Sequence, residues 1–357
     1  MKFLLKKLLY FILNILFNLA PLKKGLNFSN INIVILVNKP YLGLGDLSML
    51  SPFILLIEKK FKNRVFVLSD YDNFLKIENI EWVKQRKNKH ILKNSLVISP
   101  VLVFAHFKYI FQSKYFIGYF IGSKLVSNFI KCSYKHNPKN EHFLEKVFPI
   151  LDLIGIDYDK DNLEYPMLKT KYYDIGSTDK YIVVAPYSNW KERQYPIDNY
   201  KKLINDLIHR YNYKIILIGS PGSNEIIFNK LISDLYVDNN LIDLTGKTSI
   251  LEMNYLINKA QLFIGNDSGP ANISYLTAKK SIVFFGSVRF ENRLPLNNKL
   301  KSNILALDSR MSCKFFPCYN GYNAPTCIND KKYICLSETF VNVEQLNNIL
   351  GGGVSEY

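Results

Sequence analysis

The sequence predicts an α/β protein made of two doubly wound parallel-sheet domains. Short apolar runs alternate with stretches of helical length, and this alternation occurs once in each half of the chain. A length of 357 residues with 48% hydrophobic content suits about two packed domains of ~150 residues each. The expected strands cover 31–37, 64–69, 95–99, 181–186, 214–220, 262–266 and 281–287, and the clearest helices cover 49–61, 197–211 and 250–260.

Residues 1–24 precede the first expected strand and predict an amphipathic helix that associates with a membrane. The apolar run from Leu8 to Ala20 is shorter than the ~20 residues of a membrane span, and two asparagines interrupt it. The sequence before Pro21 is not a small-x-small cleavage site, which argues against a signal peptide. Lysines at both ends suit anionic headgroups. The alternative is a helix that packs on the protein's own core.

The rest of the chain is expected to form two domains joined by a polar linker. The polar segment 169–180 is the expected linker between an N-terminal domain, 25–170, and a C-terminal domain, 171–335, and residues 336–357 are expected to form a C-terminal helix and tail. The formal net charge of +16 suggests a polyanionic partner, which is a nucleic acid, an anionic membrane or a phosphorylated substrate. Because the charge is spread along the chain, it does not choose among them.

Two loops that follow expected strands carry polar residues at helix starts. In the second half, Gly265 ends a strand, Asp267 and Ser268 stand where a helix begins, and Gly269 permits a close approach of the backbone. In open α/β sheets, ligands bind at the carboxyl ends of strands, beside helix N-termini. An ordinary helix N-cap also favours Asp or Ser at this position.

The matching loop in the first half contains Gly43, Gly45 and Asp46. The glycines allow a tight turn, but Gly43-Leu-Gly45 lacks the third glycine of a dinucleotide-binding fingerprint. A carboxylate facing a cleft between two domains is placed to act as a general base. The sequence therefore favours Asp46 as a general base beside a tight glycine turn.

Four segments, in order, resemble the signatures of glycosyltransferase family 9, the family of the bacterial ADP-heptose:lipopolysaccharide heptosyltransferases. They are GLGDLSMLSP, APYSNWKERQYPIDNYKKLINDL, IGSPGSNE and LTGKTSILEMNYLINKAQLFIGNDSGPANISYLTAKKSIVFFGS. The resemblance covers about Ile31 to Leu350 and includes NEHFLEKVFPILDLIGI. It implies a GT-B fold, in which two Rossmann-like domains face each other across a cleft.

The resemblance also implies an activity, which is inverting transfer of a heptose or related sugar without a catalytic metal or other cofactor. The donor would be a nucleotide sugar, ADP-heptose above all, and the acceptor a glycolipid or oligosaccharide of lipopolysaccharide, lipooligosaccharide or another surface glycan. Asp46 would be the base, and the N-terminal domain would hold the acceptor, with Gly43 and Gly45 in the acceptor-side loop. The C-terminal domain would hold the donor. The donor-binding residues would be Ser188, Lys191, Arg193, Glu225, Asp267, Ser268 and Gly269. The enzyme would lie on the cytoplasmic face of the inner membrane.

Two residues depart from the family pattern. Arg193 in RQYP occupies a position that is usually lysine, which keeps the positive charge and allows two parallel hydrogen bonds to a phosphate. Asn272 replaces a common histidine, so a charged or proton-transferring role is lost there. The alternative for Arg193 is a solvated surface charge.

The chain has five cysteines, four of them near the C-terminus. Cys132 stands alone and is expected in a core. Cys313, Cys318, Cys327 and Cys335 cluster near the C-terminus, but their spacing is wider than the usual zinc knuckle, so zinc is the weaker alternative.

Two other functions remain open from the sequence. One is a transferase of the same fold that uses a UDP- or GDP-sugar. The other is a non-catalytic nucleotide- or nucleic-acid-binding protein, suggested by the net charge and by 24 Tyr and 24 Phe. No basic cluster reaches a recognised nucleic-acid motif, so we expect no nucleic-acid partner.

Overall fold

The computed structural model describes most of both predicted domains. The described residues are 28, 30–37, 42–62, 64–84, 89–100, 106–110, 112–119, 129–132, 137, 139–176, 180–236, 240–277, 279–308, 313–319 and 326–351. The helix expected at 1–24 lies outside these residues. Among them, no helix is both long enough and apolar enough to cross a bilayer.

The N-terminal domain is built on a parallel sheet in which the described residues form six strands. The strand order is β3-β2-β1-β4-β5-β6, with the first strand in the middle of the sheet. The strands are β1 (Asn32–Val37), β2 (Val65–Ser69), β3 (Ile80–Val83), β4 (Ser95–Ser99), β5 (Tyr115–Tyr119) and β6 (Phe129–Cys132). In register, Ile35 of β1 lies opposite Val67 of β2 and Ile98 of β4.

The C-terminal domain repeats the same arrangement. Its described strands are β7 (Tyr181–Ala185), β8 (Lys214–Leu217), β9 (Leu241–Asp243), β10 (Leu262–Asn266), β11 (Lys280–Phe285) and β12 (Ile304–Asp308). They are parallel and follow the order β12-β11-β10-β7-β8-β9. Counted from the first strand of its own domain, each sheet has the order 3-2-1-4-5-6, which is that of Rossmann folds.

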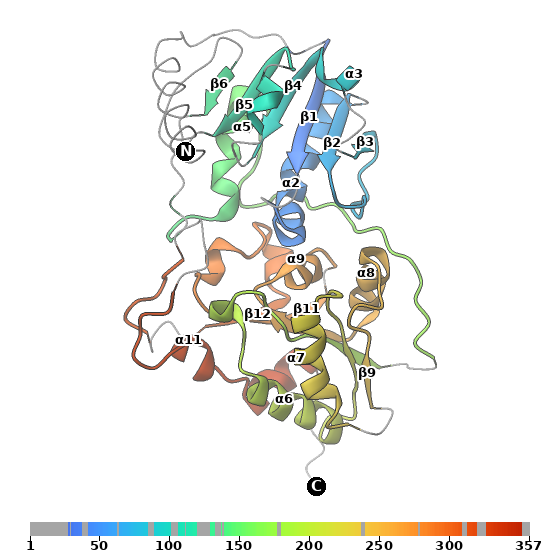
Figure 1. Cartoon of the computed structure of the whole chain (residues 1–357), viewed down its shortest axis with the longest axis vertical. Helices are drawn as coiled ribbons and strands as arrows, with labels where there is room; N and C mark the ends of the chain where they lie inside the picture. The colour runs from blue at the N-terminus through green and yellow to red at the C-terminus, as the bar shows by residue number, and fades with distance from the viewer. Residues whose placement is uncertain are drawn as a thin grey trace, which may run out of the picture.

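Helices connect the strands and cover the sheets (Figure 1). The longer ones are α2 (Leu44–Phe61), α6 (Ile197–His209), α7 (Ser223–Ser233), α8 (Ile250–Lys259), α9 (Gly269–Leu276) and α12 (Val343–Leu350). The shorter ones are α3 (Lys89–Leu92), α4 (Phe107–Ile110), η2 (Phe143–Lys146), α5 (Phe148–Leu153), η3 (Lys191–Arg193), η4 (Phe290–Asn292), α10 (Asn298–Lys301) and α11 (Ile334–Ser337).

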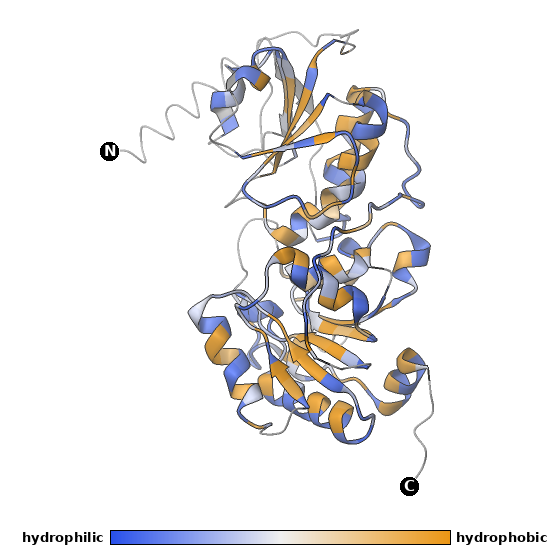
Figure 2. Cartoon of the chain, turned by 90° about the vertical axis from the view of Figure 1, so that its right-hand side faces the viewer, coloured by the Kyte–Doolittle hydropathy of each residue, from blue (hydrophilic) through white to orange (hydrophobic). Residues whose placement is uncertain are grey.

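The hydropathy of each element follows from its place in this fold. The central strands are mainly apolar, with polar residues at their ends, whereas α6 alternates apolar and polar residues around its axis (Figure 2). Parallel strands are covered on both faces and therefore consist of continuous apolar residues. In β7, β10 and β11, Val183, Ile264 and Phe284 are fully buried. Tyr195 stacks on Phe284, with 3.7 Å between the ring centroids. Both rings belong to a core cluster that also includes Leu346 of α12.

Most of the expected strands are present, but β3, β5, β6, β9 and β12 were not expected. Each lies toward an edge of its sheet, and in β3, β6 and β9 a charged residue interrupts or ends a short apolar run. β5 and β12 do have apolar runs, which were not recognised as strands. In β12 the residues are all only partly buried. The expected helix at 49–61 begins earlier, at Leu44, which places Asp46 inside its first turn.

The two domains contact each other through the N-terminal ends of α2 and α9. A Cβ added at Gly45 would lie 2.8 Å from Nδ2 of Asn272 and 3.3 Å from Cα of Gly269. Only glycine therefore allows this approach without a shift of the neighbours. The chain near the expected linker runs extended between the domains, where Lys169 N–H donates to Phe74 O and Lys171 N–H donates to Leu251 O.

Candidate active site

The site lies where the carboxyl ends of the two sheets face each other. Asp46 follows β1, Arg193 follows β7 and Asp267 follows β10. In each sheet the strand order reverses beside its first strand, between β1 and β4 and between β7 and β10. Such switch points leave a crevice in which α/β proteins bind ligands. The fold therefore brings together the two loops that the sequence singled out.

Asp46 is held at the start of α2 by a capping interaction. The Gly43 N–H donates to Asp46 Oδ2 at 2.8 Å, and Gly43 is the N-cap residue. The positive end of the helix favours a carboxylate there. This contact occupies one carboxylate oxygen from one side, so Oδ1 remains available to a substrate. Asp46 is partly exposed, as a base that meets an acceptor must be.

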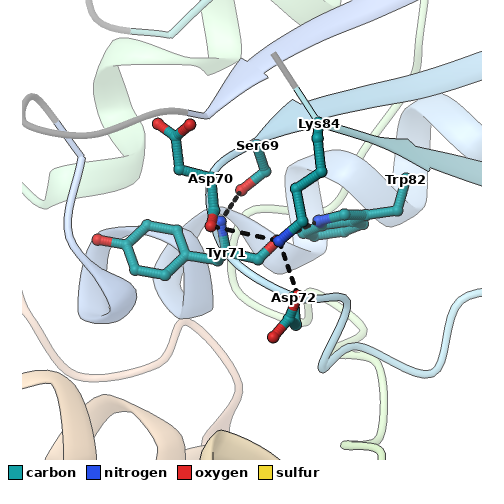
Figure 3. Close-up of polar contacts among 6 residues, drawn as sticks. All are labelled: Ser69, Asp70, Tyr71, Asp72, Trp82 and Lys84. Atoms are coloured by element: carbon teal, nitrogen blue, oxygen red, sulfur yellow. Dashed lines mark hydrogen bonds and ion pairs between the residues drawn. The ribbon is translucent and has the colours of Figure 1, made fainter. Parts of the chain in front are cut away.

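The loop after β2 supports the loop that carries Asp46. Tyr71 donates its O–H to the carbonyl of Leu42 at 3.1 Å. Its own loop is held by Trp82, which donates Nε1–H to Tyr71 O at 2.7 Å, and by Lys84, which bonds to Asp72 at 2.7 Å (Figure 3). Burial, with the charges of Asp46 and Asp70, raises the pKa of Tyr71 to about 12. The phenol is therefore a permanent donor at neutral pH.

On the opposite side, Arg193 and Asp267 form an ion pair in the C-terminal domain. Arg193 Nη1 lies 3.4 Å from Asp267 Oδ2, and their side chains are 17% and 3% exposed. The guanidinium also lies 4.3 Å from the Trp190 ring and 5.4 Å from the Tyr319 ring, measured to the centroids. Asp267 and the two rings thus orient the Arg193 side chain, which is not the solvated surface charge of the alternative prediction.

Asn266, one residue before Asp267, fixes the loop that carries Arg193. It is fully buried, donates Nδ2–H to Pro186 O at 2.8 Å and accepts a bond from Tyr195 N–H at 2.9 Å. Its amide therefore ties β10 to both sides of η3. The asparagine of the Gly-Asn-Asp-Ser-Gly-Pro block has this structural role, which sequence reasoning did not assign.

The other residues predicted to bind the donor lie on several elements around the Arg193–Asp267 pair. Ser268 is the N-cap of α9, and Gly269 is the first residue of that helix. Gly269 comes close to Leu44 and Gly45 of the N-terminal domain, so its small size serves the domain contact. Ser188 is buried and its Oγ accepts a bond from Trp190 N–H at 3.4 Å, which shapes the turn before Arg193.

Lys191 and Glu225 lie in less enclosed positions. Lys191 is exposed on η3. Glu225 is in the first turn of α7 and bonds to Ser220. Burial raises the pKa of Glu225, although the hydrogen bonds from Ser220 lower it. No contact joins either side chain to the Arg193–Asp267 pair within the described part of the chain.

Sequence reasoning missed three residues that the fold brings to the same place: Lys146 of η2, Arg293 after η4, and Tyr319. The Arg293 guanidinium lies 5.4 Å from the Tyr319 ring, as does that of Arg193. The charges of Asp267 and Asp46 act on Arg293, and the charge of Asp46 acts on Lys146. Single charged residues without a spacing pattern give no signal in a sequence, so only the fold reveals them.

Comparison with known proteins agrees with this architecture. The family model described as glycosyltransferase family 9 (heptosyltransferase) matches residues 99–319. The chain belongs to this family. The solved structure of E. coli ADP-heptose lps heptosyltransferase II shares its fold, with a TM-score of 0.61 and 14% identity over 90% of this chain and 98% of that one. The fold is therefore GT-B, as the resemblance implied.

Curated relatives of family 9 match over different lengths. Lipooligosaccharide heptosyltransferase 2 of Campylobacter jejuni is 24% identical over 292 residues, which cover 77% of this chain and 87% of the relative. The lipopolysaccharide core heptosyltransferase OpsX of Haemophilus influenzae is 26% identical over 144 residues. That match covers 39% of this chain and only 40% of OpsX, which is less than half of the relative's length.

Asn272, which replaces the common family 9 histidine, is buried at the domain contact. It donates Nδ2–H to Ser268 O at 2.9 Å, one turn earlier in α9. This bond keeps the amide beside Gly45, where it helps set the distance between the domains. The role is one of packing and hydrogen bonding, which needs no charge.

The four C-terminal cysteines are free thiols and lie near one another. Burial, together with the charges of Cys313, Cys318 and Cys327, raises the pKa of the Cys335 thiol to about 12. Among the described residues, however, no group of three or more His, Cys, Asp or Glu side chains is placed to hold a metal ion. The zinc alternative therefore stays a prediction from the sequence. The side chain of Cys132 lies outside the described part.

Proposed function

We propose that this family 9 protein is an inverting, metal-independent glycosyltransferase of lipopolysaccharide or lipooligosaccharide core biosynthesis. The observation that carries the proposal is the placement of the Asp46 carboxylate opposite the Arg193–Asp267 pair, at the meeting of two Rossmann-like sheets. Relatives named as heptosyltransferases, one of them as an ADP-heptose enzyme, favour a heptose carried by ADP.

In the proposed reaction, Asp46 accepts the proton of an acceptor hydroxyl. The oxygen attacks the anomeric carbon of the donor from the face opposite the diphosphate, and the bond from this carbon to the diphosphate oxygen breaks. The bonding pair leaves with the nucleoside diphosphate, so the configuration inverts. A general base contributes typically 10²–10⁴-fold to such a step.

Positive charge for the departing diphosphate would come from the protein. Arg193 supplies a guanidinium that lies against the rings of Trp190 and Tyr319, and the N-terminus of α9 supplies backbone N–H groups at Ser268 and Gly269. Asp267 orients Arg193, and its second oxygen would accept hydrogen bonds from sugar hydroxyls. No metal or other cofactor takes part in this proposal, because these groups provide the required stabilisation.

The proposed acceptor is a glycolipid or an oligosaccharide joined to one. We place the enzyme in the cytoplasm, at the cytoplasmic face of the inner membrane, with residues 1–24 as the membrane-associating helix. Its lysines and apolar residues support this assignment. The membrane would then bring enzyme and acceptor to the same surface.

Calorimetric titration of the full chain with ADP, GDP and UDP tests the donor class, and transfer from ADP-heptose to a core acceptor tests the activity. We expect the tightest binding for ADP and transfer only with ADP-heptose. Preference for UDP or GDP would replace the donor with that of the alternative same-fold transferase. Tight nucleotide binding without any transfer or donor hydrolysis would support the non-catalytic alternative instead.

A further inference from the structure

A buried arginine lines a cavity between the two domains. Arg293 is 8% exposed and shares the cavity with Ser48 and Met49 of α2 and with Tyr275 of α9. Its guanidinium has five donors, and its contacts are the Met49 sulfur at 3.9 Å and the phenol of Tyr319. Among the described residues, no carboxylate forms an ion pair with it. The charges of Asp267 and Asp46 favour its charged form, and the donors that Tyr319 does not use can bind an anionic ligand.

Lys146 provides a second cation beside the first. Its Nζ lies 3.5 Å from the centroid of the Phe143 ring, and the Arg293 guanidinium lies 5.5 Å from the same ring. The side chain is partly buried. Burial above all, together with the charge of Arg293, lowers the pKa of Lys146 to about 7, against the opposing effect of Asp46. Lys146 is not part of the cavity lining, but the charge of Arg293 acts on it, and an anion bound by both groups would offset this repulsion.

The cavity wall also carries an unsatisfied hydrogen-bond donor. Tyr275 is 3% exposed, and its hydroxyl has no partner among the described residues. Asn272, also in the wall, has its Oδ1 without a partner there, which is an acceptor and would meet a hydroxyl of a ligand. A ligand with both an anionic group and hydroxyls matches these atoms.

We propose that Lys146 and Arg293 form a second anion-binding subsite, which holds an anionic group of the acceptor saccharide next to the hydroxyl that Asp46 deprotonates. The anionic group is a phosphate monoester or a carboxylate. The proposal rests on the proposed function for the identity of the acceptor. It deepens that function by assigning Lys146 and Arg293, which the sequence did not indicate, to the acceptor side.

The acceptor is favoured over the donor because of which charges surround Lys146. Lys146 belongs to η2, which packs against α2 of the N-terminal domain, and the charges that act on it are those of Asp46 and Arg293. Arg193, the proposed diphosphate ligand, pairs with Asp267 and stacks on Trp190. Arg293 lies between the two sides, since the charges of both Asp267 and Asp46 act on it and its guanidinium, like that of Arg193, lies 5.4 Å from the Tyr319 ring. The assignment to the acceptor side therefore rests on Lys146.

Sulfate binding to the full chain tests the subsite without any need for turnover. Sulfate remains a dianion throughout the range used, so its own ionisation does not interfere. With ADP saturating the donor site, we expect Lys146→Met to weaken sulfate binding about tenfold or more, as for loss of a charge-assisted hydrogen bond. Lys160→Met is the matched control, since Lys160 also contacts an aromatic ring, Phe148, but is exposed and paired with Glu145.

The pH dependence identifies Lys146 as the group involved. With its pKa near 7, Lys146 is charged below pH 7 and neutral above it. Sulfate affinity should therefore fall as the pH rises from about 6 to 8.5 in the wild type. Lys146→Arg should keep the affinity and lose this dependence, because arginine stays charged. His142, which bonds to Leu294 O, and Asp46 are the neighbouring titratable groups and are unchanged in these variants.

Two results would overturn the proposal. Loss of sulfate binding when ADP is added would assign the subsite to the donor diphosphate, and unchanged affinity in folded Lys146→Met would remove Lys146 from it. Competition by glucose 6-phosphate and glucuronate tests the saccharide source: displacement by either identifies its anionic group, whereas displacement by neither contradicts an acceptor site. Because these are binding measurements, a failed transfer assay would leave their outcome intact.

Discussion

The Asp46 carboxylate has a structural contact and a proposed catalytic role. Gly43 N–H donates to Oδ2 and fixes the first turn of α2, while the proposed reaction needs an oxygen free to accept a proton. An asparagine at this position keeps a carbonyl oxygen for the Gly43 N–H but has little basicity. Position 46 therefore allows the structural role to be separated from the catalytic one.

Asp46→Asn should reduce the rate of transfer by about 10²–10⁴-fold and leave ADP affinity nearly unchanged, because a general base acts on the acceptor. Initial rates and calorimetric titration with ADP give the two quantities. The melting temperature should stay close to that of the wild type, since the cap is retained. Near wild-type turnover would leave Asp46 as a capping residue only.

Arg193 is the residue on which donor binding should depend most. Arg193→Ala should weaken ADP binding by roughly 1.5–3 kcal/mol, the range for a hydrogen bond to a charged group, and Arg193→Lys should recover part of the loss. Lys191→Ala should cost less, because Lys191 is exposed and Arg193 is held by Asp267. Titration of the variants with ADP measures the differences. Equal affinities for all of them would place Arg193 outside the site.

At the scale of elements, the N-terminal ends of α2 and α9 form the contact that brings the two halves of the site together. Gly45 and Gly269 meet there, with Asn272 beside them. A side chain at Gly45 would enter space that the other domain occupies. The separation of the domains, and with it the distance from Asp46 to the donor side, depends on the size of one residue.

Gly45→Ala should therefore shift the domains apart or displace Asn272, and overpacking of this kind typically costs about 1–3 kcal/mol. We expect a lower transfer rate, a larger radius of gyration by small-angle scattering, and little change in ADP affinity. In Gly43→Ala the added Cβ would meet only Asp46 Oδ2, at 3.5 Å, so the scattering should not change. A Gly45→Ala protein with a wild-type radius of gyration and transfer rate would show that Asn272 moves aside without separating the domains.

At the scale of the whole molecule, residues 1–24 are proposed to bring the enzyme to its acceptor. Deleting them should release the protein from anionic vesicles, since each lysine near such a surface contributes about 1 kcal/mol, and less as salt screens it. Transfer to a lipid-embedded acceptor should slow, while a short soluble acceptor is used equally well. Co-sedimentation with anionic liposomes at low and high salt is the assay, and undiminished binding would leave the segment as a packing helix.

Much of the architecture could be predicted from the sequence because buried parallel strands consist of consecutive apolar residues. Strands such as β1, β7 and β10 lie at the centre of their sheets and have this pattern. Glycines and polar residues directly after them located Asp46 and Asp267. Edge strands such as β3 were missed, since partial burial allows a polar residue such as Glu81 to interrupt the apolar run.

The tertiary structure alone decided which distant residues share the site. Lys146 and Arg293 are far apart in the chain and belong to no periodic pattern, yet both contact the ring of Phe143. Periodicity reports which side of an element is buried, because burial acts on every turn or strand in the same way. The meeting of two single charges depends instead on how the two domains pack, and that is set by the contact between α2 and α9.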